Sequence, residues 1–157
     1  MLRWLWLSLV VVIIDQVSKQ FVESSLLVFE QVPVLPFLNL TLAYNEGAAF
    51  SFLSDQAGWQ RWFFIIVGLV VTLVLVVWMG RLRADQRLTA TALSLVAGGA
   101  LGNIIDRLLL GHVVDFIDLY YQDWHWPAFN VADSAITLGV VLMLAETVRE
   151  ERQREPL

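Results

Sequence analysis

Four long apolar segments constrain this chain more than any other feature of its sequence. They cover about residues 2–22, 62–79, 88–105 and 131–148. The last three hold about eighteen residues each, or about 27 Å at 1.5 Å per residue, which is close to the thickness of a bilayer hydrocarbon core. Backbone polar groups in lipid must be satisfied within the segment itself, so the four segments are predicted to be transmembrane α-helices.

The first segment admits a second interpretation. The uncharged run 4–14 follows Arg3, as the apolar core of a cleavable signal peptide follows its basic end. Residues 15–19 then continue into another apolar pair without an obvious small-x-small cleavage site. A retained helix is therefore the expectation.

Basic residues indicate the side of the membrane that holds the two ends of the chain. Four crossings place both ends on one side. The arginines that fall on that side are Arg3, Arg81, Arg83, Arg87, Arg149, Arg152 and Arg154. Cytoplasmic segments carry an excess of Lys and Arg, so both termini are predicted to be cytoplasmic. Segments 23–58 and 108–130 are then extracytoplasmic.

Composition excludes several classes of protein. Of the 157 residues, 58% are hydrophobic and only 16% charged, whereas a soluble domain carries about a quarter charged residues. The absence of cysteine removes disulfide and thiol chemistry. A net charge of -5 argues against binding to nucleic acid. The two histidines, His112 and His125, form no HExxH motif, so a metalloprotease has little support.

The two extracytoplasmic segments are too long to be simple connections between helices. Residues 28–37 contain two prolines, and residues 38–44 partly alternate apolar and polar side chains, which predicts one or two short strands. Residues 112–119 and 126–129 have a similar character. Residues 55–61 could form a short surface helix. The predicted fold class is mainly α, a polytopic protein of one membrane domain with four helices and a small extracytoplasmic sheet.

Most of the unusual polar residues gather in one layer near the outer ends of the predicted helices. They are Asp15 and Lys19 in the first helix, Asn45 and Asp115 in the outer segments, Asn103, Asp106 and Arg107 in the third helix, and Asn130 and Asp133 at the start of the fourth. Ionisable groups at membrane depth are costly and usually serve a function or pair with one another. Scattered structural residues would not be expected to share one layer.

Structural interpretations remain open for several of these residues. Asn103 could join helices, while Asp106 and Arg107 could form an interfacial ion pair. Asp15 and Lys19 have the i,i+4 spacing of an ordinary helical ion pair.

Small residues on the third predicted helix also allow two readings. Gly98, Gly99 and Gly102 could let another helix approach closely. The same surface could instead leave room for an acyl chain or a signal-peptide helix.

Asp115 and Asp133 are the candidates for chemistry. Asp115 lies between apolar neighbours, where desolvation should raise its pKa. Asp133 occupies the first turn of its helix if Phe129 or Asn130 caps that helix, and the helix dipole then favours the ionised carboxylate. It could also be an ordinary acid that stabilises this turn. If the two carboxyl groups lie close together they would share one proton, as in sites that activate water near neutral pH.

Five sequence blocks resemble the signature of a known family, the bacterial lipoprotein signal peptidases (signal peptidase II). The blocks are Asp15, Asn45-Glu46-Gly47-Ala48-Ala49-Phe50, Gly102-Asn103-Ile104-Ile105-Asp106-Arg107, Val113-Val114-Asp115-Phe116 and Phe129-Asn130-Val131-Ala132-Asp133-Ser134. They occur in the order and at the spacing of the family, and the resemblance covers nearly the whole chain.

The resemblance implies an intramembrane aspartyl endopeptidase of the bacterial cytoplasmic (inner) membrane, with its active site at the outer leaflet. Its substrates would be prolipoproteins that carry a diacylglyceryl group on the lipobox cysteine, and it would cut just before that cysteine. A β-cradle outside the membrane is implied, and no metal or organic cofactor. Prolipoproteins and membrane lipids would be its partners, with no nucleic acid, and we expect a monomer.

The resemblance also implies roles for individual residues. Asp115 and Asp133 would be catalytic. The substrate-binding residues would be Asn45, Gly47, Asn103, Arg107 and Asn130, with Asp15 and Asp106 in support.

Two rival functions also explain acidic residues in a membrane. A small proton-coupled transporter needs a polar path through both leaflets. The inner half of the second helix, residues 69–78, offers only Thr72, and the third offers Thr89, Thr91 and Ser94. A membrane scaffold would use the polar layer only to hold its helices together.

Overall fold

The computed structural model describes residues 1–47 and 58–154. The elements in chain order are η1 (Leu2–Trp4), α1 (Leu5–Ser25), β1 (Gln31–Leu35), β2 (Leu38–Asn45), α2 (Trp59–Arg81), α3 (Arg87–Leu109), β3 (Val113–Tyr121), β4 (Trp124–His125) and α4 (Val131–Arg154). Four helices in these ranges are long and apolar enough to cross a membrane, which confirms the predicted class. Each reaches beyond the apolar run that predicted it.

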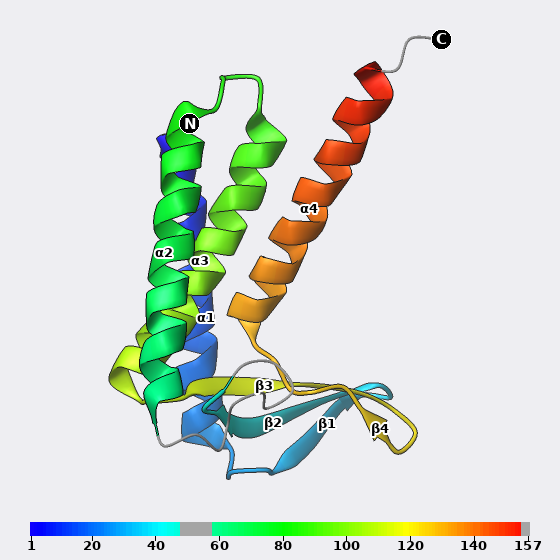
Figure 1. Cartoon of the computed structure of the whole chain (residues 1–157). Coiled ribbons are helices and arrows are strands. Elements are labelled where there is room, and N and C mark those ends of the chain that lie inside the picture. Colours follow the sequence, from blue (N-terminus) through cyan, green and yellow to red (C-terminus); the bar gives the residue numbers. More distant parts are fainter. Residues whose placement is uncertain (48–57, 155–157) are drawn as a thin grey trace.

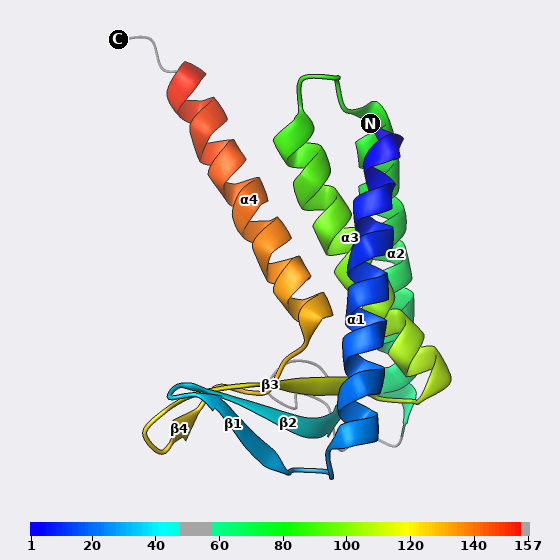
Figure 2. The same cartoon turned by 180° about the vertical axis from the view of Figure 1, so that it is seen from behind.

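Helix α3 packs against each of the other three helices. Helix α4 diverges from α1 and α2 with distance from the sheet (Figures 1 and 2) but stays against α3, where a Cβ atom on Gly139 would meet Val96 and Ala92. The sheet lies across one end of the bundle. The N-terminus and the connection between α2 and α3 lie at the opposite end (Figure 1).

Glycines on α3 allow its two neighbours to approach closely. A Cβ atom on Gly98 would lie 2.9 Å from the backbone of Ser8 on α1. One on Gly99 would collide with the carbonyl oxygen of Ala132 on α4. The glycine surface therefore serves helix packing, the first of the two readings, and α1 is an integral part of the bundle.

Helix α2 exposes apolar side chains around much of its surface. Ile66, Val70, Leu73 and Val74 are each more than half exposed. Such a surface is unfavourable in water, while hydrocarbon solvates it without cost. On its inner side α2 contributes to an apolar cluster with α3 that contains Leu75, Met79, Leu93, Val96 and Ala97.

The four strands form one antiparallel arrangement in the order β1-β2-β3-β4. In β3, Val114 and Phe116 pack with Val22 and Leu42 in a buried cluster that joins the sheet to α1. Successive side chains of a strand point to opposite faces. Asp115 therefore faces the other side of the sheet.

One local expectation was wrong. Residues 126–129 form no strand, since β4 covers Trp124–His125 and Phe129 makes a single bridge to Ile117. Of the possible surface helix at 55–61, residues 59–61 are the first turn of α2, and residues 55–57 lie outside the described ranges. Gly58 begins α2 as its N-cap at φ 83°, a conformation that glycine adopts without strain.

Candidate active site

Asp115 projects from β3 into a polar site beneath α4. Its partner on β2 is Ala43, and Asn45 lies two residues further along β2 on the same face. Asn45 Nδ2 donates to Asp115 Oδ2 at 3.0 Å, and Asn130 Nδ2 donates to Asp115 Oδ1 at 2.7 Å. The residue is only 3% exposed.

The environment of Asp115 favours its neutral form. Burial raises the pKa of Asp115 to about 7, and the negative charge of Asp133 acts in the same direction. The amides of Asn45 and Asn130 and the charge of Lys19 act in the opposite direction. Desolvation prevails because the hydrogen bonds that Asp115 accepts come from neutral amides.

Asp133 lies in the first turn of α4 and forms a reciprocal cap with Asn130. The backbone N–H of Asp133 donates to Asn130 Oδ1 at 2.9 Å, and the N–H of Asn130 donates to Asp133 Oδ2 at 3.3 Å. This exchange has the pattern of a capping box. Asn130 is thus the cap, one of the two residues expected. Asn103 Nδ2 on α3 donates to Asp133 Oδ1 at 2.8 Å.

Asn130 connects the two aspartates. Its side-chain nitrogen donates to Asp115 while its side-chain oxygen accepts from the backbone of Asp133. Its side chain is completely buried. The amide of Asn130 therefore serves the two carboxyl groups, and its role in substrate binding stays a prediction.

A second group of charges lies directly behind Asp133. Lys19 Nζ on α1 contacts Asp15 Oδ2 at 2.7 Å and Asp106 Oδ2 at 2.8 Å, and it donates to Asn103 Oδ1 at 3.1 Å. All three charged residues are at most 2% exposed. Gln16 Nε2 also donates to Asp106 Oδ1 at 2.7 Å.

The carboxylates of this group also anchor neighbouring backbone. Asp15 Oδ1 accepts the N–H of Ala132 at 2.9 Å, in the first turn of α4. Asp106 Oδ2 accepts the N–H of Val114 at 3.2 Å, next to Asp115. The two residues expected to support the site thus hold the backbone beside each candidate catalytic residue.

Arg107 does not pair with Asp106, contrary to the interfacial ion pair considered from the sequence. Its Nη2 donates to the carbonyl oxygen of Gly47 at 2.8 Å, and its guanidinium carbon lies 5.0 Å from the ring centroid of Phe64. Gly47 also donates its N–H to Asn45 Oδ1 at 3.0 Å. Arg107 therefore holds the end of β2, where Asn45 meets Asp115.

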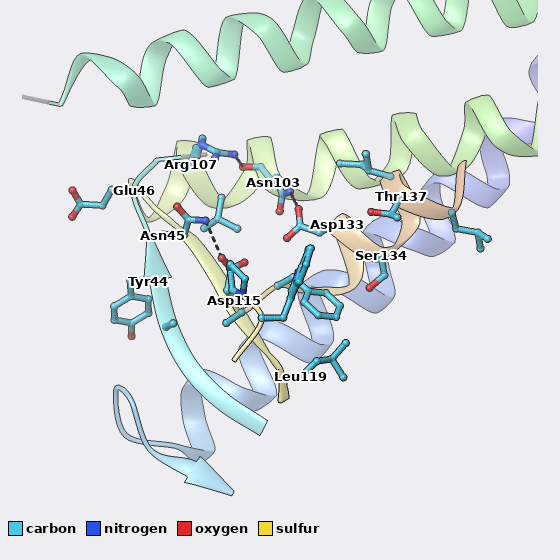
Figure 3. A pocket seen from close by; sticks show the side chains of 18 of the residues that line it. Tyr44, Asn45, Glu46, Asn103, Arg107, Asp115, Leu119, Asp133, Ser134 and Thr137 are labelled. Atoms are coloured by element: carbon cyan, nitrogen blue, oxygen red, sulfur yellow. Dashed lines mark hydrogen bonds between the residues drawn. The ribbon is translucent and has the colours of Figure 1, made fainter. Parts of the chain in front are cut away.

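Both aspartates open onto a large cavity of about 1180 Å³. Its polar wall includes Asn45, Asn103, Arg107, Asp115 and Asp133, and its apolar wall continues along α4 through Ile136, Leu138 and Val141. Figure 3 shows Asp115 and Asp133 facing the same space, with Asn45 and Asn103 bonded to their outer sides. Two aspartates held by amide groups at the wall of one such cavity are the arrangement expected of an aspartic peptidase.

Sequence comparison identifies the family of this chain. The family profile described as signal peptidase (SPase) II matches residues 7–149. The lipoprotein signal peptidase of Pseudomonas syringae pv. tomato is 52% identical over 156 residues, covering 98% of this chain and 90% of its own. That of Yersinia pseudotuberculosis is 54% identical over 145 residues, covering 92% and 86%. The chain belongs to the signal peptidase II family.

Two solved structures have the same fold. Both are described as bacterial membrane enzymes studied by the in meso method. One, at 2.3 Å resolution, has a TM-score of 0.88 and 34% sequence identity, over 99% of this chain and 93% of the other. The second, at 1.9 Å resolution, has a TM-score of 0.81 and 36% identity, over 92% of each chain.

Two residues that hydrogen-bond to members of this polar layer lie outside the predicted site set. Lys19 was considered only as the ion-pair partner of Asp15, and Gln16 was not considered. The sequence carried one signal for Lys19, because an ammonium one turn from Asp15 in an apolar helix must be neutralised. Nothing in the sequence indicated that Lys19 also reaches Asn103 on a different helix.

Proposed function

We propose that Asp115 and Asp133 are the catalytic pair of this signal peptidase, which removes signal peptides from prolipoproteins. The observation that carries the assignment is the hydrogen bonding of Asn130 to both residues at the wall of one cavity. A buried carboxyl group that served only the fold would be expected to face a cation or a closed interior. These two face open space.

The two carboxyl groups have complementary roles in the proposed reaction. Asp133 accepts hydrogen bonds from Asn103 and from the backbone of Asn130 at the positive end of a helix, which favours its ionised form. It takes a proton from a water molecule as that water attacks the scissile carbonyl carbon. Asp115 is protonated below about pH 7 and donates to the developing oxyanion. A proton then passes to the leaving amine.

The cavity suits a peptide that carries lipid. Its polar end holds the carboxyl groups, and its apolar wall follows α4 toward the region that the membrane would occupy. We propose that the diacylglyceryl chains and the signal peptide lie in this apolar part, which places the bond before the lipidated cysteine at Asp115 and Asp133. Asn45, Asn103 and Arg107 line the polar end, where they can position the substrate backbone.

We place the sheet end of the molecule outside the cytoplasm, at the outer leaflet of the inner membrane. The basic residues Arg81, Arg83 and Arg87 lie at the opposite end, between or beside the ends of α2 and α3. Cytoplasmic loops are enriched in such residues. The catalytic pair comes from one chain, so a monomer suffices, with lipid against the apolar faces of α2 and α4.

The absence of cysteine from the chain makes this topology testable. In an Asp123→Cys variant, a membrane-impermeant thiol reagent added outside intact cells should label the protein. In an Asp85→Cys variant, labelling should require permeabilised cells. The reverse pattern would contradict the proposed orientation.

The catalytic assignment is tested by conservative substitution. Asp115→Asn and Asp133→Asn should each lower the rate of cleavage of a diacylglyceryl-modified precursor in detergent micelles by about 10³-fold or more, because each removes one partner of the proton exchange. Asp123→Asn, an exposed aspartate in the turn between β3 and β4, is the matched control and should cleave normally. Thermal unfolding checks that the variants are folded. Full activity in either of the first two variants would remove that residue from the pair.

A further inference from the structure

Lys19 lies behind the catalytic pair but is connected to it through one side chain. Its ammonium group donates to Asn103 Oδ1 at 3.1 Å, and Asn103 Nδ2 donates to Asp133 Oδ1 at 2.8 Å. An ammonium group offers only donors, whereas a carboxamide has one oxygen and one nitrogen end. The oxygen of Asn103 must therefore face Lys19, and its nitrogen must face Asp133.

We propose that Lys19 is a positioning residue for the reaction, which fixes the orientation of the Asn103 amide and so keeps Asp133 the ionised member of the catalytic pair. This inference rests on the proposed function of Asp115 and Asp133. If the amide were reversed, its oxygen would face a carboxylate, and the repulsion would favour a protonated Asp133. The base would then be missing when water has to be activated.

The surrounding charges do not supply this effect by themselves. Lys19 faces Asp15 on its own helix and Asp106 on α3, so the three groups together carry one negative charge. Asp133 also faces the charges of Asp115 on β3 and Arg107 on α3. A net negative cluster behind Asp133 would disfavour its ionisation. The directed hydrogen bond through Asn103 is therefore one of the contributions that favour it, together with the backbone N–H of Asn130 and the charge of Arg107.

The burial of Lys19 indicates that the orientation is held firmly. Its side chain is 3% exposed, and its three acceptors come from two helices. Asn130 Nδ2 also donates to Asn103 Oδ1, at 3.3 Å, which points the same oxygen away from Asp133.

The test is the pH dependence of kcat in a charge-balanced variant. Lys19→Met combined with Asp106→Asn removes one positive and one negative charge, so the cluster keeps its net charge. The control, Asp106→Asn alone, retains Lys19 and its bond to Asn103. The acidic limb of the profile reports ionisation of the base. Loss of the oriented donor should move this limb upward by about one to two pH units relative to the unmodified protein, whose cluster has the same net charge, while Asp106→Asn alone shows the effect of losing that carboxylate with Lys19 still in place.

A cycle with Asn103→Leu tests whether Lys19 acts through this amide. Asn103→Leu alone removes the donor to Asp133 and should move the limb by a similar amount. Adding Lys19→Met and Asp106→Asn to it should then produce no further shift, because Lys19 acts on Asp133 only through the hydrogen bond that Asn103→Leu has already removed. Additive shifts would show that Lys19 acts independently of Asn103 and would overturn the proposal.

A purely structural role for Lys19 predicts a different result. Partial unfolding lowers the rate equally at every pH and leaves the limb in place, and that outcome in a variant that still binds substrate would overturn the proposal. If the first pair does not yield folded enzyme, Lys19→Met with Asp15→Asn is the second charge-balanced pair, again compared with the unmodified protein and with Asp15→Asn alone as the control. Failure of the proposed function is separate, since it would appear as activity in Asp115→Asn or Asp133→Asn.

Discussion

Two pairs of aspartates lie side by side in this molecule and have opposite surroundings. Asp15 and Asp106 flank the ammonium group of Lys19 at 2.7 and 2.8 Å in the closed packing of α1 and α3. The side chains of Asp115 and Asp133 are hydrogen-bonded by neutral amides and backbone N–H groups, and they line a cavity. All four residues lie in the same polar layer of the chain.

The difference separates two environments of one residue type. The ammonium group of Lys19 offsets part of the cost of burying Asp15 and Asp106 and ties both to the packing of α1 and α3. A carboxyl group held by amides keeps its position while its protonation state can change. The raised pKa of Asp115 follows from this, since burial there is not offset by a direct ion pair.

The largest expected effect comes from removing the cation between Asp15 and Asp106. Lys19→Met leaves Asp15 and Asp106 buried without their cation and should lower the free energy of unfolding by about 3–5 kcal/mol. Denaturant titration of the purified protein in detergent would measure this loss. A variant as stable as the unmodified protein would show that the ion-paired cluster does not hold α1 against α3.

The exposed pair of Arg83 and Asp85 is the matched control for that experiment. Their side chains are 76% and 66% exposed, and Nη2 lies 2.8 Å from Oδ2. The hydrogen bond from Arg83 lowers the pKa of Asp85, but water solvates both groups in the unfolded chain as well. Asp85→Asn should therefore leave the unfolding midpoint unchanged.

A somewhat smaller effect on the free energy of unfolding, of opposite sign, is expected from substituting Asp115 at the cavity. Between pH 4 and 7 the folded protein keeps the proton of Asp115, while the unfolded chain, with an ordinary aspartate pKa of 3.8, has lost it. The unfolded state then binds fewer protons, so Asp115 lowers stability as the pH rises through this window and costs a constant amount above it. Asp115→Asn removes this cost.

The measurement is the unfolding free energy of Asp115→Asn minus that of the unmodified protein at a series of pH values. The difference should rise by about 2–4 kcal/mol between pH 4 and 7 and then level off. Asp123→Asn, whose carboxyl group is solvated in both states, should show no such rise. A constant difference for Asp115→Asn would contradict the raised pKa and weaken the contrast between the two pairs.

Most of the fold could be predicted because hydrophobic length and alternation are local properties. The four apolar runs became helices, and the alternating segments near residues 40 and 116 became β2 and β3. The errors fell where local pattern is weak. Residues 126–129 have strand-like side chains, yet the chain there leads from the sheet into α4, and only Phe129 pairs with a strand.

The candidate site was predicted unevenly for the same reason. The residue types and their common depth followed from the sequence, and so did the capping position of Asn130. The hydrogen-bond and ion-pair partners of these residues did not follow from the sequence. An ion pair between Asp106 and the adjacent Arg107 was one interpretation left open by the sequence, but α3 turns the two side chains apart, toward Lys19 and Gly47. Contacts between different helices depend on their relative rotation, which no local pattern records.

The sequence by itself determined that this chain crosses a membrane four times and carries its costly polar residues in one layer, because hydrocarbon accepts few alternatives. Only the tertiary structure decided which of those residues neutralise each other. Packing around the α3 glycines brings Lys19 between Asp15 and Asp106, whereas Asp115 and Asp133 accept hydrogen bonds from amides and backbone N–H groups at the wall of the cavity. The environment of each carboxyl group follows from that division, since electrostatic interactions depend on distances of a few ångströms between segments far apart in the chain.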